Sequence, residues 1–204
     1  IICDEFTAKE AGAFAGEGKI YLYSDICTTE PDPALLQEVR EHAIDTDPLY
    51  IVFTSGSTGV PKGVVACHRS VIDYIEQLSS VLEVNENTVF GNQAPLYFDA
   101  CLKELYPTLK FGATAYLVPH DRFMFPIKLE FLNEKKINTI CWVVSALTMI
   151  SAFKTFDKIK PEYIHTVAFG SEVFPIKQFN IWRENLPDAK FINLYGPTEA
   201  TGMS

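Results

Sequence analysis

Residues 50–67 read YIVFTSGSTGVPKGVVAC and carry the clearest structural signal in the chain. Residues 50–54 and 63–67 are runs of β-branched, aromatic and other apolar side chains, which predict two strands. Glycine lets the backbone between them approach an anion closely, hydroxyls and amides donate to phosphate oxygens, and Lys62 adds a positive charge. The loop residues concerned are Thr54, Ser55, Gly56, Ser57, Thr58 and Gly59. This pattern favours a phosphate-binding loop between strands over a flexible linker, and a Walker A loop is excluded because a strand, not a helix, follows Lys62.

Beyond this loop, strands and helices alternate along the chain. The spacing of apolar residues predicts strands at 88–91, 113–118, 139–143, 166–169 and 190–194. It predicts helices at 34–43, 70–82, 99–110, 126–136, 147–156 and 175–185, the first with Asp32 as its N-cap. Strands separated by helices indicate an α/β fold of mixed, mostly parallel sheets with helices packed on them. We expect residues 48–204 to form a nucleotide- and substrate-binding core, and residues 1–47 a peripheral segment of the same large domain.

The composition excludes several classes of protein. The 204 residues carry a net charge of −9, which disfavours nucleic acid and anionic membranes as partners. We expect no signal peptide, because no basic region precedes an apolar stretch in residues 1–10, and the apolar runs are shorter than the roughly 18 residues of a membrane span. The five cysteines are scattered without a C-x-x-C pair, so we expect reduced thiols in a cytoplasmic protein. The chain starts without Met and stops beside a predicted binding loop, so we expect a piece of a longer protein.

A second motif, NLYGPTEAT at residues 193–201, follows the last predicted strand. Ligand sites in open α/β sheets lie beyond the carboxyl ends of the strands. Together with the loop at residues 54–63, this motif resembles the two signatures of the adenylate-forming superfamily. That group includes acyl-CoA ligases, luciferases, D-alanine–carrier protein ligases and the amino acid adenylation domains of peptide synthetases. The resemblance covers residues 48–204 and implies the large N-terminal domain of such an enzyme, without its small C-terminal domain.

The resemblance implies a site for ATP and Mg²⁺. Lys62, Thr198 and Glu199 match the residues that act on the phosphates, with Glu199 as a carboxylate ligand of Mg²⁺. Tyr195 matches an aromatic residue that offers its ring face to the purine. Besides the loop at residues 54–59, the other matching nucleotide-binding positions are Gly170, Ser171, Glu172, Asn193 and Gly196.

The pair Phe98-Asp99 separates the subfamilies. The resemblance implies that Asp99 binds the α-ammonium group of an amino acid, and such a partner would stabilise a buried carboxylate. The alternative is that Asp99 is only a helix N-cap. An acyl-CoA ligase for a carboxylic acid without an amine would not need this anion. The positions that match the pocket for the substrate's side chain are Ala100, Lys103, Cys141, Val167, Phe169 and Leu194.

Lys103 adds a charge to the predicted pocket. It follows Asp99 by four positions, so the two residues share one helix face. The lysine could pair with an acidic substrate side chain such as that of glutamate or aspartate. It could also be neutralised by Asp99 or Glu104, or point to solvent.

The resemblance implies a reaction in two halves. An amino acid and ATP give aminoacyl-AMP and pyrophosphate, and the phosphopantetheine thiol of a carrier protein then takes the aminoacyl group. We expect residues 1–204 alone to catalyse little adenylation, because the family's Y-x-T-G-D-like segment and C-terminal lysine are absent from them. The alternative from another class is a noncatalytic nucleotide-binding module.

Overall fold

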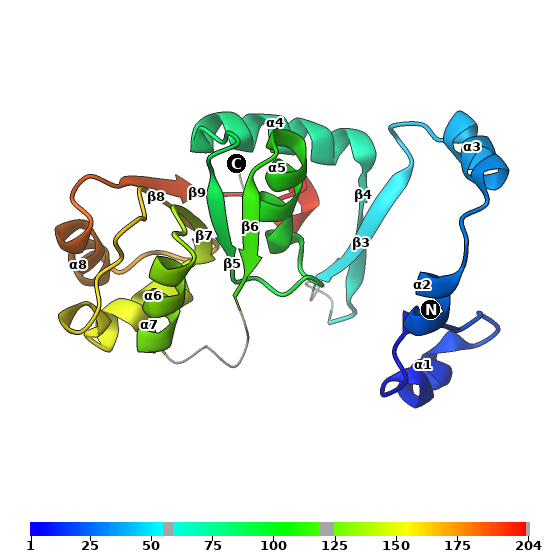
Figure 1. The fold of residues 1–204 in the computed structure, drawn as a ribbon, viewed down its shortest axis with the longest axis horizontal. Coiled ribbons are helices and arrows are strands. Elements are labelled where there is room, and N and C mark those ends of the chain that lie inside the picture. Colours follow the sequence, from blue (N-terminus) through cyan, green and yellow to red (C-terminus); the bar gives the residue numbers. More distant parts are fainter. Residues whose placement is uncertain (55–58, 119–124, 203–204) are drawn as a thin grey trace. The chain divides into compact units, whose positions relative to one another are not determined.

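The computed structural model describes residues 1–54, 59–118 and 125–202 (Figure 1). These residues divide into two compact units, Ile1–Ile44 and Asp45–Ser204. The boundary lies close to the predicted one at residue 47. That the first unit is a peripheral part of the same large domain stays a prediction.

The first unit is small and mostly exposed. Its elements are β1 (Ile2–Cys3), α1 (Ala8–Ala15), β2 (Tyr21–Leu22), α2 (Tyr23–Thr28) and α3 (Pro33–His42). The two short strands pair in parallel. The prediction of Asp32 as N-cap is confirmed, because its carboxylate accepts hydrogen bonds from the backbone N–H groups of Ala34 at 3.0 Å and Leu35 at 3.1 Å.

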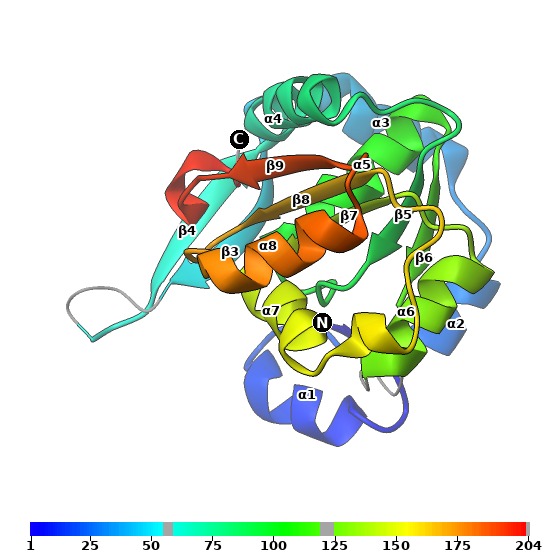
Figure 2. The ribbon, with the colours of Figure 1, turned by 90° about the vertical axis from the view of Figure 1, so that its left-hand side faces the viewer.

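The second unit is built on a five-stranded parallel sheet (Figure 2). Its strands are β5 (Val89–Asn92), β6 (Thr114–Leu117), β7 (Thr139–Val143), β8 (Thr166–Gly170) and β9 (Lys190–Leu194). Their order across the sheet is β6-β5-β7-β8-β9. The predicted fold class is therefore confirmed, since helices connect the strands of this sheet and cover both its faces.

Each face of the sheet packs on its own set of helices. The helices α4 (His68–Leu82) and α5 (Leu102–Phe111) cover one face, with Cys141 and Ala168 of the sheet beneath them. The other face carries Trp142 and Val167 and is covered by α6 (Phe125–Glu134), α7 (Val144–Ala152) and α8 (Ile176–Asn185). Successive residues of a strand point to opposite faces, which explains why neighbours in sequence join different cores.

The strands predicted around the glycine–hydroxyl loop form an antiparallel hairpin. β3 (Pro48–Thr54) pairs with β4 (Lys62–Cys67), and Thr54 lies opposite Lys62 next to the loop. This confirms a strand-to-strand connection. Ser55, Gly56, Ser57 and Thr58 lie outside the described residues.

One predicted helix differs clearly from the observed element. We predicted a helix at residues 147–156, whereas α7 begins at Val144 and ends at Ala152. Lys154 has a left-handed backbone conformation with φ of 52°, which ends the helix, and a separate 3-10 turn, η3 (Thr155–Asp157), follows. In the part of the chain that the structure describes, helices are too short or too polar to cross a membrane.

Candidate functional site

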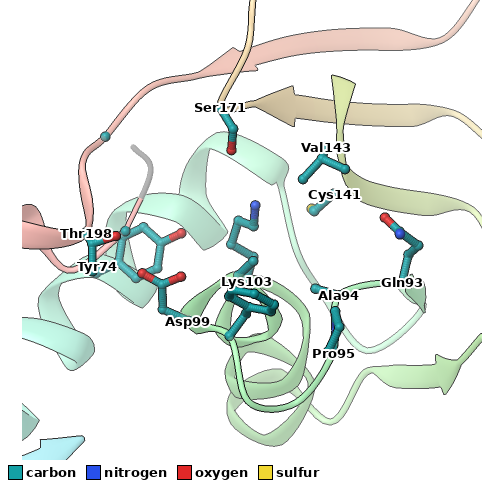
Figure 3. Close-up of a pocket in the computed structure, with 14 residues that line it drawn as sticks. Tyr74, Gln93, Ala94, Pro95, Asp99, Lys103, Cys141, Val143, Ser171 and Thr198 are labelled. Carbon is teal, nitrogen blue, oxygen red and sulfur yellow. The ribbon is translucent and has the colours of Figure 1, made fainter. Parts of the chain in front are cut away.

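A pocket of about 310 Å³ lies at the carboxyl ends of the sheet strands (Figure 3). Residues 93–95 follow β5, Val143 ends β7, Ser171 follows β8, and Gly196 and Thr198 follow β9. The carboxyl ends of parallel strands meet at one edge of a sheet, so these segments converge there. The start of α5 and the preceding 3-10 turn, η1 (Asp99–Cys101), close the pocket from one side.

Two opposite charges lie in this pocket. Asp99 is the first residue of η1 and is half-buried, while Lys103 is the second residue of α5 and only 2% exposed. Figure 3 shows the amino group of Lys103 pointing into the pocket, toward the side of Ser171 and Val143. The cap of η1 is Phe98, without a side-chain capping bond, so the structure does not support the N-cap alternative for Asp99.

The buried carboxyl group of Glu104 joins the segments that carry two of the pocket-lining residues. Glu104 is 0% exposed and accepts a hydrogen bond at 2.5 Å from Nδ2 of Asn92 and another at 3.2 Å from the backbone N–H of Cys141. Burial raises the pKa of Glu104 to about 8, although both hydrogen bonds and the charge of Lys103 act in the opposite direction. Glu104 therefore ties α5 to β5 and β7, and this contact holds Lys103 and Cys141 in place.

The cysteines near the pocket are unreactive in this setting. Burial raises the pKa of both Cys101 and Cys141, so their thiols stay protonated at neutral pH. All five cysteines are free; Cys101 and Cys141 are buried, whereas Cys27 is exposed. Among the described residues, His, Cys, Asp and Glu do not gather in a group of three that could hold a metal ion.

The second signature contributes the wall beside α4. Thr198 begins the 3-10 turn η4 (Thr198–Ala200), and Gly202 lies against the ring of Tyr74 in α4. A Cβ atom at Gly202 would lie 2.9 Å from Cζ of that ring, and its φ of 127° also favours glycine. Glu199 is exposed in η4. A single exposed carboxylate beside a threonine hydroxyl fits Mg²⁺, which commonly takes one or two carboxylates together with substrate phosphates.

Residues 171–174, which follow β8, line a second cavity, of about 460 Å³. Ser171 borders both this cavity and the pocket, and its φ of 74° is a strained left-handed conformation for a residue other than glycine. The predicted nucleotide residues around this cavity are Ser171, Glu172, Asn193 and Tyr195. Gly170 ends β8 next to them. The ring of Tyr195 is 81% exposed, so its face is accessible to a ligand.

The described residues of the first signature lie on the hairpin, and they are not among the residues that line the pocket. Lys62 and Gly59 are exposed and Thr54 is half-buried. Gly59 has φ of 78°, a conformation that favours glycine. In both ribbon views the segment that carries η4 lies beside the β3–β4 hairpin (Figures 1 and 2). That both signatures contact one nucleotide stays a prediction.

Four of the predicted substrate-pocket residues line the pocket and three do not. Asp99, Ala100, Lys103 and Cys141 line the pocket. Val167 and Phe169 point to the opposite face of the sheet and pack in the core under α6, α7 and α8. They pair in register with Ile140 and Trp142, whereas Cys141 pairs with Ala168. Leu194 is buried in the core under α4 and does not line this pocket. Phe169 and Leu194 border the second cavity instead, and that Val167, Phe169 and Leu194 contact a substrate side chain stays a prediction.

Several lining residues were missed by the sequence analysis. They are Tyr74, Gln93, Ala94, Pro95, Phe98, Val143 and Gly202. Residues 93–95 follow a predicted strand directly, so the rule that sites lie beyond strand ends could have found them. Tyr74 lies within α4, the helix that follows the first signature and β4, and its sequence context gives no comparable signal.

Comparisons with known proteins agree with this fold and site. A family model described as AMP-binding enzyme matches residues 5–204. The chain belongs to the AMP-binding enzyme family. A D-alanine--D-alanyl carrier protein ligase of Bacillus cytotoxicus is 34% identical over 79% of this chain and 32% of its own length. An L-proline--(L-prolyl-carrier protein) ligase of Pseudomonas fluorescens is 34% identical over 77% of this chain and 32% of its own length.

A solved structure shares the architecture of this family member. The Vibrio cholerae adenylation domain AlmE in complex with glycyl-adenosine-5'-phosphate matches with a TM-score of 0.80 and 22% identity. The match covers 100% of this chain and 42% of that chain, and it shows a common fold. The chain spans about a third of the length of the two ligases.

Proposed function

We propose that the protein containing this chain activates an amino acid with ATP and transfers it to a carrier protein. The observation that carries the proposal is the environment of the Asp99 side chain. This half-buried carboxylate lines the pocket with Thr198 of the second signature, and among the described residues it forms no hydrogen bond or ion pair. A carboxylate removed from water needs a cationic partner, and the α-ammonium group of an amino acid supplies one.

In the first half-reaction, the residues of this chain orient two anionic reactants. Asp99 holds the ammonium group, so that the substrate carboxylate faces the α-phosphate of ATP. A carboxylate oxygen forms a bond to the α-phosphorus, the bond to the β-phosphate oxygen breaks, and pyrophosphate leaves. Lys62, the loop amides and Thr198 donate to phosphate oxygens, and Glu199 would hold Mg²⁺, which neutralises phosphate charge when bound.

In the second half-reaction the acceptor thiol loses its proton and its sulfur forms a bond to the carbonyl carbon of the aminoacyl group, while the bond from that carbon to the phosphate oxygen breaks and AMP leaves. The names of the two related ligases each specify an amino acid and a carrier protein, which supports a carrier partner here. We assign the acceptor as the phosphopantetheine thiol of that carrier, either a separate protein or a domain of a peptide synthetase. The five free cysteines fit a reducing compartment, so we also propose a cytoplasmic location.

The test is ATP–pyrophosphate exchange by the full-length protein that contains residues 1–204. Each amino acid is compared with the carboxylic acid that lacks its amine, such as alanine with propionate. We expect exchange with amino acids and background exchange with the amine-free acids. Equal exchange with both would instead indicate an acyl-CoA ligase. Nucleotide binding without exchange for any acid would indicate a noncatalytic module.

A further inference from the structure

Lys103 occupies a position that is unfavourable for a cation. Its side chain is 2% exposed, and burial of an ammonium group is costly unless the charge is paired. It also lies in the first turn of α5, where the helix dipole disfavours positive charge. A lysine buried at this position therefore needs a nearby negative charge to offset the unfavourable free energy of its burial.

The chain itself does not supply this charge by direct contact. Within residues 1–54, 59–118 and 125–202, Lys103 forms no hydrogen bond and no ion pair. Both oxygens of Glu104 already accept hydrogen bonds, from Asn92 and from the amide of Cys141. Burial raises the pKa of Glu104, which disfavours a negative charge on this neighbour. Asp99 lines the same pocket but lies beyond ion-pair distance.

The pocket thus presents two separate charges to a ligand. Asp99 offers an anion near Thr198 and Tyr74, and Lys103 offers a cation deeper in the pocket, beside Cys141 (Figure 3). If Asp99 takes the α-ammonium group, and the reacting carboxylate faces ATP, Lys103 still requires an anion from the substrate side chain. We propose that the substrate is an amino dicarboxylic acid whose side-chain carboxylate pairs with Lys103, an inference that rests on the proposed amino acid activation.

The experiment compares each dicarboxylic amino acid with its uncharged isostere in the full-length protein. ATP–pyrophosphate exchange is measured with glutamate and glutamine, with aspartate and asparagine, and with leucine and alanine. We expect kcat/KM for one of the two acidic amino acids to exceed that for its amide by at least about tenfold, equivalent to about 1.4 kcal/mol. This comparison uses the unchanged protein and so does not depend on the folding of any variant.

Variants of two lysines on the same helix then assign the effect. Lys103→Met removes the charge and keeps the length of the side chain, and we expect the acid-to-amide ratio to fall at least about tenfold, mainly through KM of the acid. Lys110→Met is the matched control, because Lys110 is exposed and its amino group pairs with Glu76 on the surface. We expect this control to leave the ratio unchanged. Melting temperatures of both variants check that they are folded.

Two results would overturn the inference and leave the proposed function intact. One is exchange that is faster with glutamine, asparagine or aliphatic amino acids than with both acidic ones. The other is an equal loss for all amino acids in Lys103→Met, which would assign Lys103 to the shared carboxylate or to a phosphate. Exchange with no amino acid at all would overturn the proposed function as well.

Discussion

Glu104→Gln tests the buried carboxyl group behind the pocket. The pKa of Glu104 is raised from 4.5 to about 8, so between these two pH values the folded protein keeps a proton that the unfolded chain has lost. Stability from this group is therefore fully present below pH 4.5 and decreases as the pH rises to 8. At 1.36 kcal/mol per pH unit, the decrease over this interval is about 5 kcal/mol.

The variant removes this titration and preserves the volume of the side chain. The new amide oxygen can accept from the N–H of Cys141, and the amide of Asn92 can turn over to accept from the new NH₂ group. We expect the variant and the wild type to have similar unfolding free energies at about pH 4. At about pH 9 the variant is more stable, by a margin that approaches about 5 kcal/mol.

The assay is urea unfolding at a series of pH values from about 4 to 9, with the variant compared with the wild type at each pH. Taking the difference removes the contribution of Lys128, whose pKa is lowered to about 8 by burial and whose own effect increases stability above that pH. Glu130→Gln, which removes an exposed carboxylate from α6, is the control for a change in surface charge. Parallel pH profiles of the wild type and Glu104→Gln would refute the reasoning.

Three further substitutions test the carboxylate that binds the substrate, the nucleotide loop and the core. Asp99→Asn in the full-length protein should lower amino acid-dependent exchange by about 30-fold or more, because loss of one partner of a desolvated charge pair costs about 2 kcal/mol or more. Unchanged amino acid kinetics would show that Asp99 does not bind the substrate. Lys62→Ala should raise the KM for ATP roughly 10- to 150-fold, because a hydrogen bond from a charged group contributes about 1.5–3 kcal/mol. A change in the KM for the amino acid alone would contradict a role of Lys62 in phosphate binding. Gly91→Ala should reduce the free energy of unfolding by about 1–3 kcal/mol, because its Cβ would lie 3.1 Å from Ile137 and 3.2 Å from Leu132. Unchanged urea unfolding would show that these two side chains can move to accommodate the new methyl group.

Local sequence patterns predicted the elements of this fold well where the pattern is unambiguous. The strands at Thr139–Val143 and Lys190–Leu194 have the predicted limits, and the β-branched and aromatic residues within them favour a strand. The end of α7 was predicted too late, since the apolar pattern continues through Phe153 and Phe156 while the backbone already turns at Lys154.

The candidate site was predicted only in part, because side-chain direction depends on how the strands pair. The resemblance assigned Val167 and Phe169 to the pocket for the substrate's side chain, whereas in the structure both pack in the core under α6, α7 and α8 and Phe169 also borders the second cavity. Glu104 was considered only as a partner for Lys103. Its bonds to Asn92 and Cys141 join segments 12 and 37 residues away, and such long-range contacts leave no local pattern.

The order of strands in the parallel sheet has a consequence for synthesis of the protein. β3 and β4 are close in sequence, so this hairpin can form as soon as both strands leave the ribosome. One edge of β5 can pair only after β7 has been made, because Phe90 of β5 lies opposite Thr139 of β7. Until then the backbone N–H and C=O groups at this edge are unpaired and can form hydrogen bonds with other chains. Chaperone binding to growing chains should therefore peak after β5 emerges and fall once β7 has been made.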